Sequence, residues 1–428
     1  MNKQPCDIGI IGLGVMGKNL LLNMTDHGFS VAGYDKKNST DIKDFIQSLR
    51  EPRAILLLVP AGAAVDDVIQ ELLPLLKPDD LIIDAGNSYF KDTDIRAQYL
   101  QKHGIQFLGV GISGGEEGAR HGPSIMPGGP KEAYARVQKI FEAIAAKVNN
   151  QPCVTYLGPG SSGHFVKMVH NGIEYGIMQL IAETYDFMKR GLNFNNKQLA
   201  EIYTEWNTGE LSSYLIEITS HIFNNSIIDL ILSVAKQNGT GMWTSQSAME
   251  LQVPIPTIDV AVSMRDMSVL ITEREEASVK YPRPIKTFTD FNLTQLHDAL
   301  FAAMILTYTQ GFNVLAAASK HYNYGLDLKA ISRIWQGGCI IRAAMLNNID
   351  TSHDLLMKHQ ESLRQIVCHA AQSGIPLPAF MASLSYFDAY RSTWSPANLI
   401  QAQRDYFGAH TYERTDKKGI FHTEWEKQ

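Results

Sequence analysis

Short apolar runs alternate with helical patterns over the first 160 residues. Residues 7–11 are typical of a buried strand, and the helical pattern that follows reaches His27 and stops at Gly28, a residue type that often ends helices. Further strands are predicted at 29–34, 54–59, 81–84, 106–110 and 154–157, and helices at 41–49, 64–76 and 131–147. This alternation predicts a doubly wound α/β sheet.

The pattern changes after the glycine-rich segment 158–163. Long helical runs with Ala- and Leu-rich faces replace the alternation, and the last residues show little periodic core. We therefore expect a Rossmann-like nucleotide-binding domain over 1–160, a large all-helical substrate and dimerisation domain over 161–395, and a C-terminal tail over 396–428.

The first predicted strand runs directly into a glycine-rich turn. The glycines suit a tight turn and close approach to a pyrophosphate, the following helix presents its N-terminus, and Asp35 ends the second strand near a ribose. Strand, glycines, helix, strand and acid in this order predict a dinucleotide site, although a βαβ unit without nucleotide has the same layout. The turn consists of Gly12, Leu13, Gly14, Val15, Met16 and Gly17.

The run from Lys167 to Gly176 combines helical periodicity with chemistry. At 100° per residue, Lys167, Asn171 and Glu174 fall within about 60° of one another, on a strip separate from the apolar positions 166, 169, 173 and 177. Two helical glycines, Gly172 and Gly176, suggest a close backbone approach. A base, an amide and an acid on one strip indicate a catalytic helix; the alternative is an ordinary amphipathic helix with a solvated Lys and Glu.

Composition excludes several classes of protein. The 428 residues are 45% hydrophobic with a net charge of −6, and no basic run suggests nucleic acid. No leader or stretch of membrane-spanning length is predicted. The four cysteines, at 6, 153, 339 and 368, have no paired spacing, so we expect free thiols in the cytoplasm and no metal site.

Several long motifs resemble the decarboxylating 6-phosphogluconate dehydrogenase family, and the resemblance covers nearly the whole chain. Related β-hydroxyacid dehydrogenases share the glycine turn and a lysine on the interdomain helix, but are not expected to share the HNGIEYG run or the QRDYFGAH tail. The motifs are GLGVMG (12–17), DAGNS (84–88), ISGGEEGARHGPSIMPGG (112–129), GHFVKMVHNGIEYG (163–176), NGTGMWT (238–244), WQGGCIIR (335–342) and IQAQRDYFGAHTYE (400–413).

The resemblance implies an oxidoreductase of the pentose phosphate pathway. It would convert 6-phospho-D-gluconate to D-ribulose 5-phosphate and CO2, with hydride transfer to NADP. By resemblance, Lys167 is the general base that takes the proton of the 3-hydroxyl, and Glu174 is the acid that protonates C1. The alternative is a trimmed relative that binds sugar phosphate or nucleotide but turns over poorly.

The resemblance also assigns binding residues. Arg404 and His410 match residues that the family supplies from the partner subunit, which implies a homodimer with shared sites. Taken singly, a glycine-rich loop, a turn Asn or an Arg has ordinary structural explanations. The substrate-binding set is Asn87, Ser113, Gly114, Gly115, His170, Asn171, Tyr175, Asn238 and Arg265. The cofactor-binding set adds Asp35, Lys36, Lys37, Val59, Pro60, Ala61 and again Asn87 to the glycine turn.

Four departures from the family pattern concern binding. Asn238 and Met242 stand where the family usually has Lys, and Pro60 replaces another Lys beside the nucleotide. The segment 36–53 has room for one helix where the family has an additional helix and edge strand. Asp35 favours the free ribose hydroxyls of NAD, whereas Lys36 and Lys37 could neutralise the 2′-phosphate of NADP. The resemblance implies NADP, and Asp35 makes NAD the alternative.

Overall fold

The structure is a computed structural model that describes residues 4–36, 41–287 and 291–425. The chain forms two compact units, Met1–Ser383 and Leu384–Gln428.

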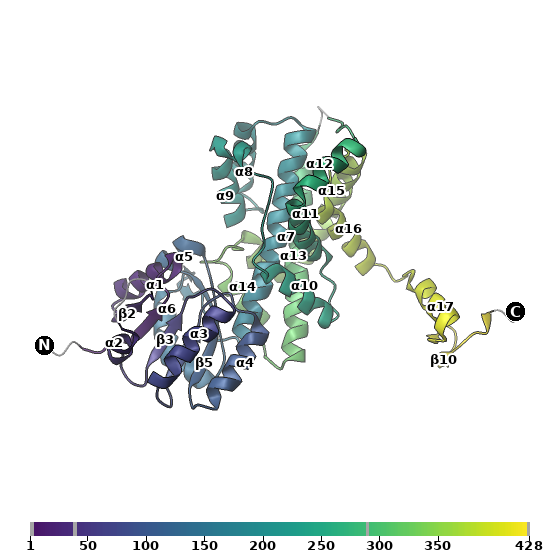
Figure 1. The fold of residues 1–428 in the computed structure, drawn as a ribbon. Helices are drawn as coiled ribbons and strands as arrows, with labels where there is room; N and C mark the ends of the chain where they lie inside the picture. Colours follow the sequence, from purple (N-terminus) through teal and green to yellow (C-terminus); the bar gives the residue numbers. More distant parts are fainter. Residues whose placement is uncertain (1–3, 37–40, 288–290, 426–428) are drawn as a thin grey trace. The chain divides into compact units, whose positions relative to one another are not determined.

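A six-stranded sheet forms the core of the N-terminal region, in the order β2-β1-β3-β4-β5-β6 (Figure 1). The first five strands are parallel and β6 pairs antiparallel with β5. The strands are β1 (Ile8–Ile11), β2 (Val31–Tyr34), β3 (Ala54–Leu57), β4 (Leu81–Asp84), β5 (Gln106–Ser113) and β6 (Ser124–Gly128).

Helices cover both faces of this sheet because successive apolar side chains in each strand point to opposite faces. Ile10 and Leu56 pack in one cluster with residues of α1 and α6, whereas Ile11 and Leu57 pack in a second cluster with residues of α2, α3 and α4. The predicted doubly wound fold is confirmed. The helices are α1 (Val15–Asp26), α2 (Ile42–Gln47), α3 (Ala63–Leu72), the 3-10 turn η1 (Leu73–Leu75), α4 (Phe90–Gln101), α5 (Gly115–His121) and α6 (Lys131–Ile144).

The part of this region from α5 to residue 157 differs from the prediction. The expected strand at 154–157 is wrong. The segment runs beside β6, with an isolated bridge between Val154 and Ile125 and a bond from the Leu157 N–H to the Pro127 carbonyl, but it forms no continuous ladder. Strand β6 and helix α5 were not predicted, since glycines and prolines interrupt their apolar patterns, and Pro127 sits in β6, where an edge strand tolerates it. A minor hairpin joins β7 (Lys147–Val148) to β8 (Gln151–Pro152).

The connection between β2 and β3 is short, as predicted. Within the described residues it contains the single helix α2, whose N-cap Asp41 accepts a hydrogen bond from the Lys43 N–H. Lys37, a predicted cofactor residue, lies outside the described residues.

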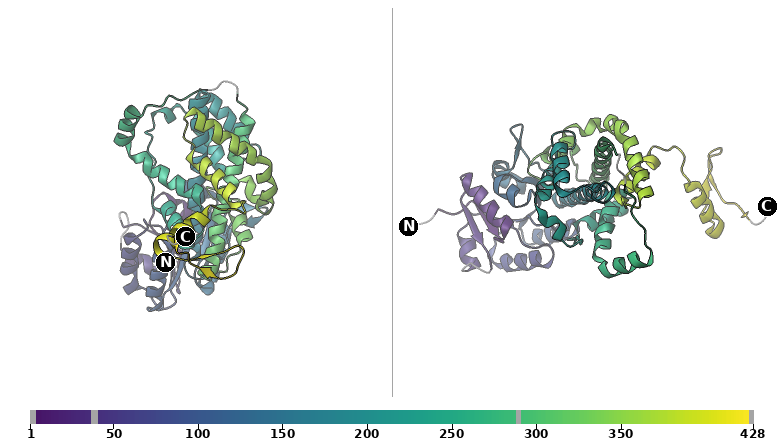
Figure 2. Two further views of the ribbon diagram at one scale, coloured as in Figure 1. Left: turned by 90° about the vertical axis from the view of Figure 1, so that its right-hand side faces the viewer. Right: turned by 90° about the horizontal axis from the view of Figure 1, so that it is seen from above.

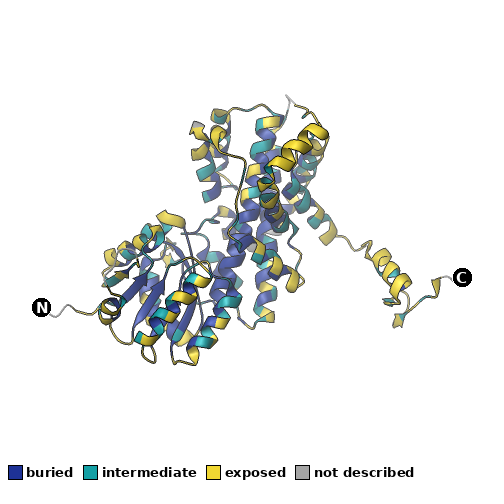
Figure 3. Cartoon of the chain, in the orientation of Figure 1, coloured by how far each residue is buried: buried dark blue, intermediate teal, exposed yellow. Residues whose placement is uncertain are grey.

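Residues from Ser162 onward form a helical region, as predicted, around two long helices that lie side by side, α7 (Ser162–Asp186) and α13 (Leu293–His321) (Figures 1 and 2). Helix α7 also packs against β5 and β6, and most of its first half is buried (Figure 3). The other helical elements are η2 (Phe187–Gly191), α8 (Asn196–Trp206), α9 (Tyr214–Phe223), η3 (Ser226–Leu230), α10 (Thr240–Glu250), α11 (Pro256–Val269), α12 (Ile271–Lys280), α14 (Leu328–Ile334), η4 (Ala344–Thr351), α15 (Ser352–Ser373) and α16 (Pro378–Tyr390).

Helix α13 corrects one expectation. By length and composition it could cross a membrane, so the prediction that no stretch reaches that length is wrong. Its apolar window is 78% buried inside the fold, which is the behaviour of a core helix that is hydrophobic all round.

The second unit contains α17 (Ala397–Gly408) and a small hairpin of β9 (Tyr412–Glu413) and β10 (Ile420–Phe421). Buried Asp405 organises it by accepting hydrogen bonds from the Thr411 and Thr423 N–H groups, the Trp425 indole N–H and the His422 ring.

Candidate active site

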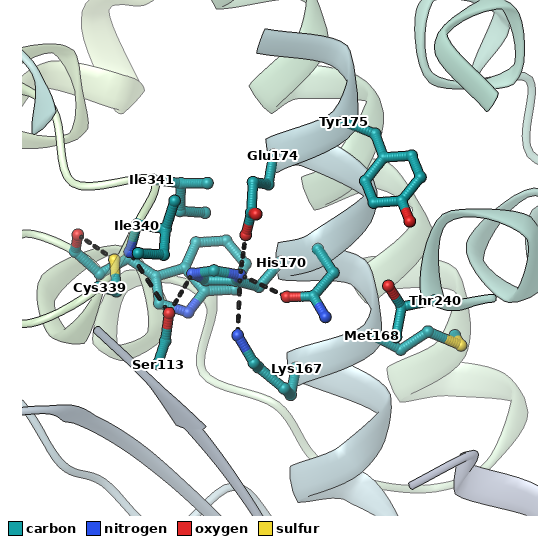
Figure 4. Close-up of polar contacts among 12 residues, drawn as sticks. Ser113, Lys167, Met168, His170, Glu174, Tyr175, Thr240, Cys339, Ile340 and Ile341 are labelled. Carbon is teal, nitrogen blue, oxygen red and sulfur yellow. Dashed lines mark hydrogen bonds and ion pairs between the residues drawn. The ribbon is translucent and has the colours of Figure 1, made fainter. Parts of the chain in front are cut away.

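Helix α7 gathers its polar residues around His170 (Figure 4). The His170 Nδ1 atom lies 3.4 Å from Lys167 Nζ, 3.1 Å from Asn171 Oδ1 and 3.8 Å from a Glu174 carboxylate oxygen. Lys167 is 6% exposed and His170 is fully buried. The alternative of a solvated Lys is therefore wrong: this strip of the helix is buried against β5, where a Cβ on Gly111 would meet the Lys167 stem at 2.3 Å.

The other ring nitrogen of His170 defines its protonation. Its Nε2 atom lies 3.1 Å from the Ser113 hydroxyl, which itself accepts the Ile340 N–H at 3.3 Å. The hydroxyl hydrogen of Ser113 is then available to donate to Nε2, which leaves the ring proton on Nδ1. An Nδ1–H group donates to Asn171 Oδ1, the nearest of its three polar neighbours.

Burial shifts the acidity of all three ionisable groups in this cluster. It lowers the pKa of Lys167 below its usual value, against the opposing charge of Glu174, and it raises the pKa of Glu174 against the charges of Lys167 and Arg265. Burial and the neighbouring Lys167 hold the pKa of His170 well below its usual value, so the ring is neutral. The two shifts bring the lysine closer to a group that can take a proton and the glutamate closer to one that can give a proton.

The predicted loop at 113–115 turns directly beneath this cluster. Gly114 has a φ of 130°, and a Cβ there would lie 2.6 Å from the Gly338 carbonyl oxygen, so only glycine fits. The turn at 335–342 thus closes the site from the far end of the sequence. Sequence reasoning noted this motif but gave no role to Ile340, whose N–H fixes the Ser113 hydroxyl.

Tyr175 and Arg265, the predicted phosphate contacts, lie together. The guanidinium carbon of Arg265 is 3.4 Å from the centre of the Tyr175 ring, and its Nη2 atom contacts the Met178 sulfur at 3.6 Å. The Tyr175 hydroxyl donates to Asn238 Oδ1 at 3.3 Å. The same oxygen accepts the Thr240 hydroxyl, so Asn238 ties the aromatic and cationic pair to the start of α10.

Two adjoining cavities, of about 420 and 530 Å³, extend along the carboxyl ends of the parallel strands, and both are lined by Gly14, Leu58, Val59 and Pro60. In doubly wound sheets, nucleotides bind at the carboxyl ends of the strands. Among the described residues, no heavy atom lies within 4 Å of a Cβ added at Gly14, so a side chain there would fill the cavity itself. The second cavity reaches Asn87, Asn238 and Thr240 and is lined by both the sheet and the helical region.

The first cavity contains Asp35 and Lys36. The Asp35 carboxylate accepts the Leu13 N–H at 3.0 Å, which holds the glycine turn against the end of β2. Lys36 is exposed and lies 3.7 Å from a Glu71 carboxylate oxygen. The structure thus brings together the predicted cofactor residues that it describes, with the acid bound to the turn itself.

Arg404 and His410 belong to the second unit. Both are exposed in the second unit, where Arg404 bonds Gln401 and the His410 ring contacts Phe407. Among the described residues, no group of three or more His, Cys, Asp or Glu side chains could hold a metal ion.

Two family models match consecutive parts of the chain. The NAD binding domain of 6-phosphogluconate dehydrogenase matches residues 7–158, and the C-terminal domain of the same enzyme matches residues 163–425. This chain belongs to the 6-phosphogluconate dehydrogenase family.

Curated 6-phosphogluconate dehydrogenases are similar to the whole chain. The NADP(+)-dependent, decarboxylating enzyme of Bacillus subtilis is 49% identical, with all of both chains covered. The decarboxylating enzyme of Escherichia coli K12 is 46% identical over 99% of this chain and all of its own. The Bacillus alignment extends over 471 residues, more than this chain has, so that relative contains residues that this chain lacks, as the short β2–β3 connection suggests.

The fold agrees with a solved 6-phosphogluconate dehydrogenase. The structure from Plasmodium falciparum, studied without ligand, with NADP+ and with 6-phosphogluconate, has a TM-score of 0.92 and 42% identity over 98% of this chain and all of that one.

Proposed function

We propose that this chain catalyses the oxidative decarboxylation of 6-phospho-D-gluconate to D-ribulose 5-phosphate and CO2, with hydride transfer to NADP, as a step of the pentose phosphate pathway. The observation that carries the proposal is the buried Lys167–His170–Glu174 cluster, in which the lysine pKa is lowered and the glutamate pKa is raised. Such a pair provides a base and an acid on one rigid helix.

The cleft fits a dinucleotide. The open cradle at Gly14 and the start of α1 suit the pyrophosphate, and Val59, Pro60, Ala61 and Asn87 line the portion toward the helical region. When bound, the nicotinamide accepts a hydride from C3 of the substrate.

Lys167 acts as the base for the first step. Its neutral amine removes the proton of the 3-hydroxyl. The neutral ring of His170, which bonds the Asn171 amide, holds the Lys167 amine in place. Because the amine has been desolvated by burial, its pKa lies closer to neutral pH, where a base works best.

Glu174 acts as the acid for the second step. The 3-keto acid loses CO2 because its ketone accepts the electrons, and the resulting enediol needs a proton at C1. The raised pKa of Glu174 keeps a larger fraction of the carboxyl protonated for this transfer. Since Glu174 lies about two turns from Lys167, the two groups can act on neighbouring carbons.

Arg265 and Tyr175 would bind the substrate phosphate. The Arg265 fork suits phosphate oxygens and lies over the Tyr175 ring. Asn238 cannot supply the charge of the usual family Lys, but it fixes the Tyr175 hydroxyl and Thr240. Ser113, Gly114 and Gly115 complete the substrate loop.

The chain is proposed to work as a homodimer in which Arg404 and His410 complete the partner's site. Apart from Asp405, α17 buries none of its residues in its own unit, and four of its apolar side chains are 58% to 72% exposed, which is typical of an interface. These side chains are Leu399, Ile400, Tyr406 and Phe407. The proposed division is then 1–160 for cofactor, 161–395 for substrate and dimerisation, and 396–428 for the partner. The four free thiols suit a cytoplasmic location.

One observation favours NAD as a second cofactor. Asp35 places a carboxylate beside the glycine turn, where it would repel a 2′-phosphate, while Lys36 lies close to Glu71. NADP remains the first choice because the Bacillus relative is NADP(+)-dependent.

A turnover assay tests the proposal. Reduced nicotinamide and released CO2 are measured with 6-phosphogluconate and either NADP or NAD. We expect both products in equal amounts. Substrate or nucleotide binding by calorimetry without turnover would instead identify a binding protein, the trimmed relative described above.

A further inference from the structure

Arg96 is a buried cation below the cofactor cleft. It projects from α4 and is only 4% exposed. Its Nε and Nη2 atoms donate to the two Asp66 oxygens at 2.6 and 3.1 Å, and Nη2 also donates to the Gly62 carbonyl at 3.0 Å. On its other side, Nη1 donates to the Ser88 hydroxyl at 3.3 Å and to Asp84 at 3.4 Å.

These partners belong to the two loops that form one wall of the cleft and, for Asp66, to the first turn of α3 that follows one of them. Gly62 ends the loop that follows β3, which contains the cleft residues Val59, Pro60 and Ala61. Asp84 and Ser88 flank the loop after β4, which contains the cleft residues Gly86 and Asn87. Arg96 therefore joins two loops that leave adjacent strands, beyond the backbone bond from the Ala85 N–H to the Leu57 carbonyl.

The loop after β4 is built on the same carboxylate. Asp84 accepts the Gly86 N–H at 3.1 Å and the Ser88 hydroxyl at 2.6 Å. Although burial opposes the charge of Arg96, Asp66 and Asp84 raise its pKa, so it remains a cation. A planar guanidinium can meet all five acceptor atoms at once, which a lysine ammonium with three donors cannot.

We propose that Arg96 is a positioning residue for the cofactor: by bonding both cleft loops it sets the position of Asn87 relative to Val59, Pro60 and Ala61. The proposal rests on the proposed use of this cleft for NADP. It goes further by naming a residue outside the cleft on which nucleotide affinity depends.

The same sheet offers a matched control at the amino ends of its strands, opposite the cleft. Arg53 is also buried, at 6% exposure, and donates to buried Asp80 at 2.9 Å and to the Ile46 carbonyl at 3.1 Å. Asp80 precedes β4, whereas Asp84 ends it, so the two Arg–Asp pairs are about 13 Å apart along one strand. Only the Arg96 pair adjoins the cleft.

The experiment compares Arg96→Lys with Arg53→Lys. The dissociation constant for NADP is measured by calorimetry, KM for both substrates by steady-state kinetics, and Tm by thermal unfolding. We expect both variants to lose thermal stability. Only Arg96→Lys should weaken NADP binding, by about 10- to 100-fold, with a smaller change in KM for 6-phosphogluconate, because Asn87 is the one affected cleft residue that also belongs to the substrate-binding set.

Wild-type NADP affinity in Arg96→Lys, or an equal loss in Arg53→Lys, would overturn the inference. If Arg96→Lys does not fold, Asp66→Asn provides the test, because the Asp66 side chain is 54% exposed and its loss removes only part of the network. It should weaken NADP binding in the same direction, and an unchanged affinity would count against the role. Failure of the wild-type protein to bind NADP would instead contradict the proposed function.

Discussion

The proposed role of Lys167 as a base depends on where its amine lies. The stem packs against Gly111 of β5, and the amine faces a neutral histidine, so water is largely excluded from the charged form. A lysine on the surface of the same helix would stay protonated at neutral pH. The backbone around α7 therefore determines whether this residue type can act as a base.

Asp35 is the residue that should set cofactor preference. We expect Asp35→Asn to raise the NADP-to-NAD ratio of kcat/KM, because the amide can still occupy the site but no longer repels a 2′-phosphate. Asp67→Asn is the matched control, since Asp67 lines the same cavity from α3 and should change the ratio less. Kinetics with both cofactors provide the measurement. An unchanged ratio in the Asp35 variant would show that this carboxylate does not face the ribose.

Part of the site could be predicted from the sequence because it is local. Lys167, Asn171 and Glu174 occupy one helix, so helical periodicity places them on one strip. The contact between Ser113 and Ile340 joins residues 227 positions apart, and no local pattern carries it. The network of Arg96 escaped prediction for the same reason, since a single arginine in a helix looks like a surface residue.

At the level of elements, α7 and α13 approach closely through a glycine. A Cβ on Gly176 would lie 2.6 Å from the Thr307 methyl carbon. Gly176→Ala should therefore destabilise the protein by about 1–3 kcal/mol despite the better helix propensity of alanine. Adding Thr307→Ser removes that methyl and keeps the hydroxyl bond to Ala303, so the double variant should recover part of the loss. Urea unfolding of the full mutant cycle measures this, and simple additivity of the two changes would argue against the close packing.

A second element contact should make stability depend on pH. Near the end of α7, buried Glu183 accepts the Ala379 and Phe380 N–H groups at the start of α16, and burial raises its pKa to about 7. As pH rises above 4.5, the unfolded chain releases this proton before the folded chain does. The stabilisation that comes from the raised pKa of Glu183 is therefore complete below pH 4.5 and is lost by about pH 7. This stabilisation amounts to about 3 kcal/mol.

Glu183→Gln removes this titration. The free energy of unfolding of the wild type minus that of the variant should fall between pH 4.5 and 7, because other groups titrate equally in both proteins. Urea unfolding across this range provides the values. A constant difference would mean that the folded and unfolded carboxyls titrate alike.

Whole elements were predicted well where one pattern runs without interruption. The buried strands β1, β3 and β4 and the long helix α7 follow from continuous apolar runs or helical periodicity. Strand β6 and the failed strand at 154–157 show the limit, because which of two short segments fills a sheet edge depends on pairing with β5.

At the scale of the whole molecule, the proposed shared site predicts complementation between subunits. Lys167→Met and Arg404→Ala homodimers should each be inactive or nearly so. Mixed dimers should recover some activity, because one of their two sites would combine an intact Lys167 with an intact Arg404. Refolded mixtures with two different affinity tags allow the mixed dimer to be isolated. An inactive mixed dimer would place the tail in its own subunit's site or outside any site.

The most direct measurement of the central claim is the rate of nicotinamide reduction in a single turnover with 6-phosphogluconate. Lys167→Met should slow this step by about 10²–10⁴-fold, because no other base is available on that strip of α7. Glu174→Gln should keep a rapid first reduction and slow only the later steps, since its proton is needed after CO2 has left. Nicotinamide reduction in Lys167→Met at close to the wild-type rate would contradict the assignment of Lys167 as the base.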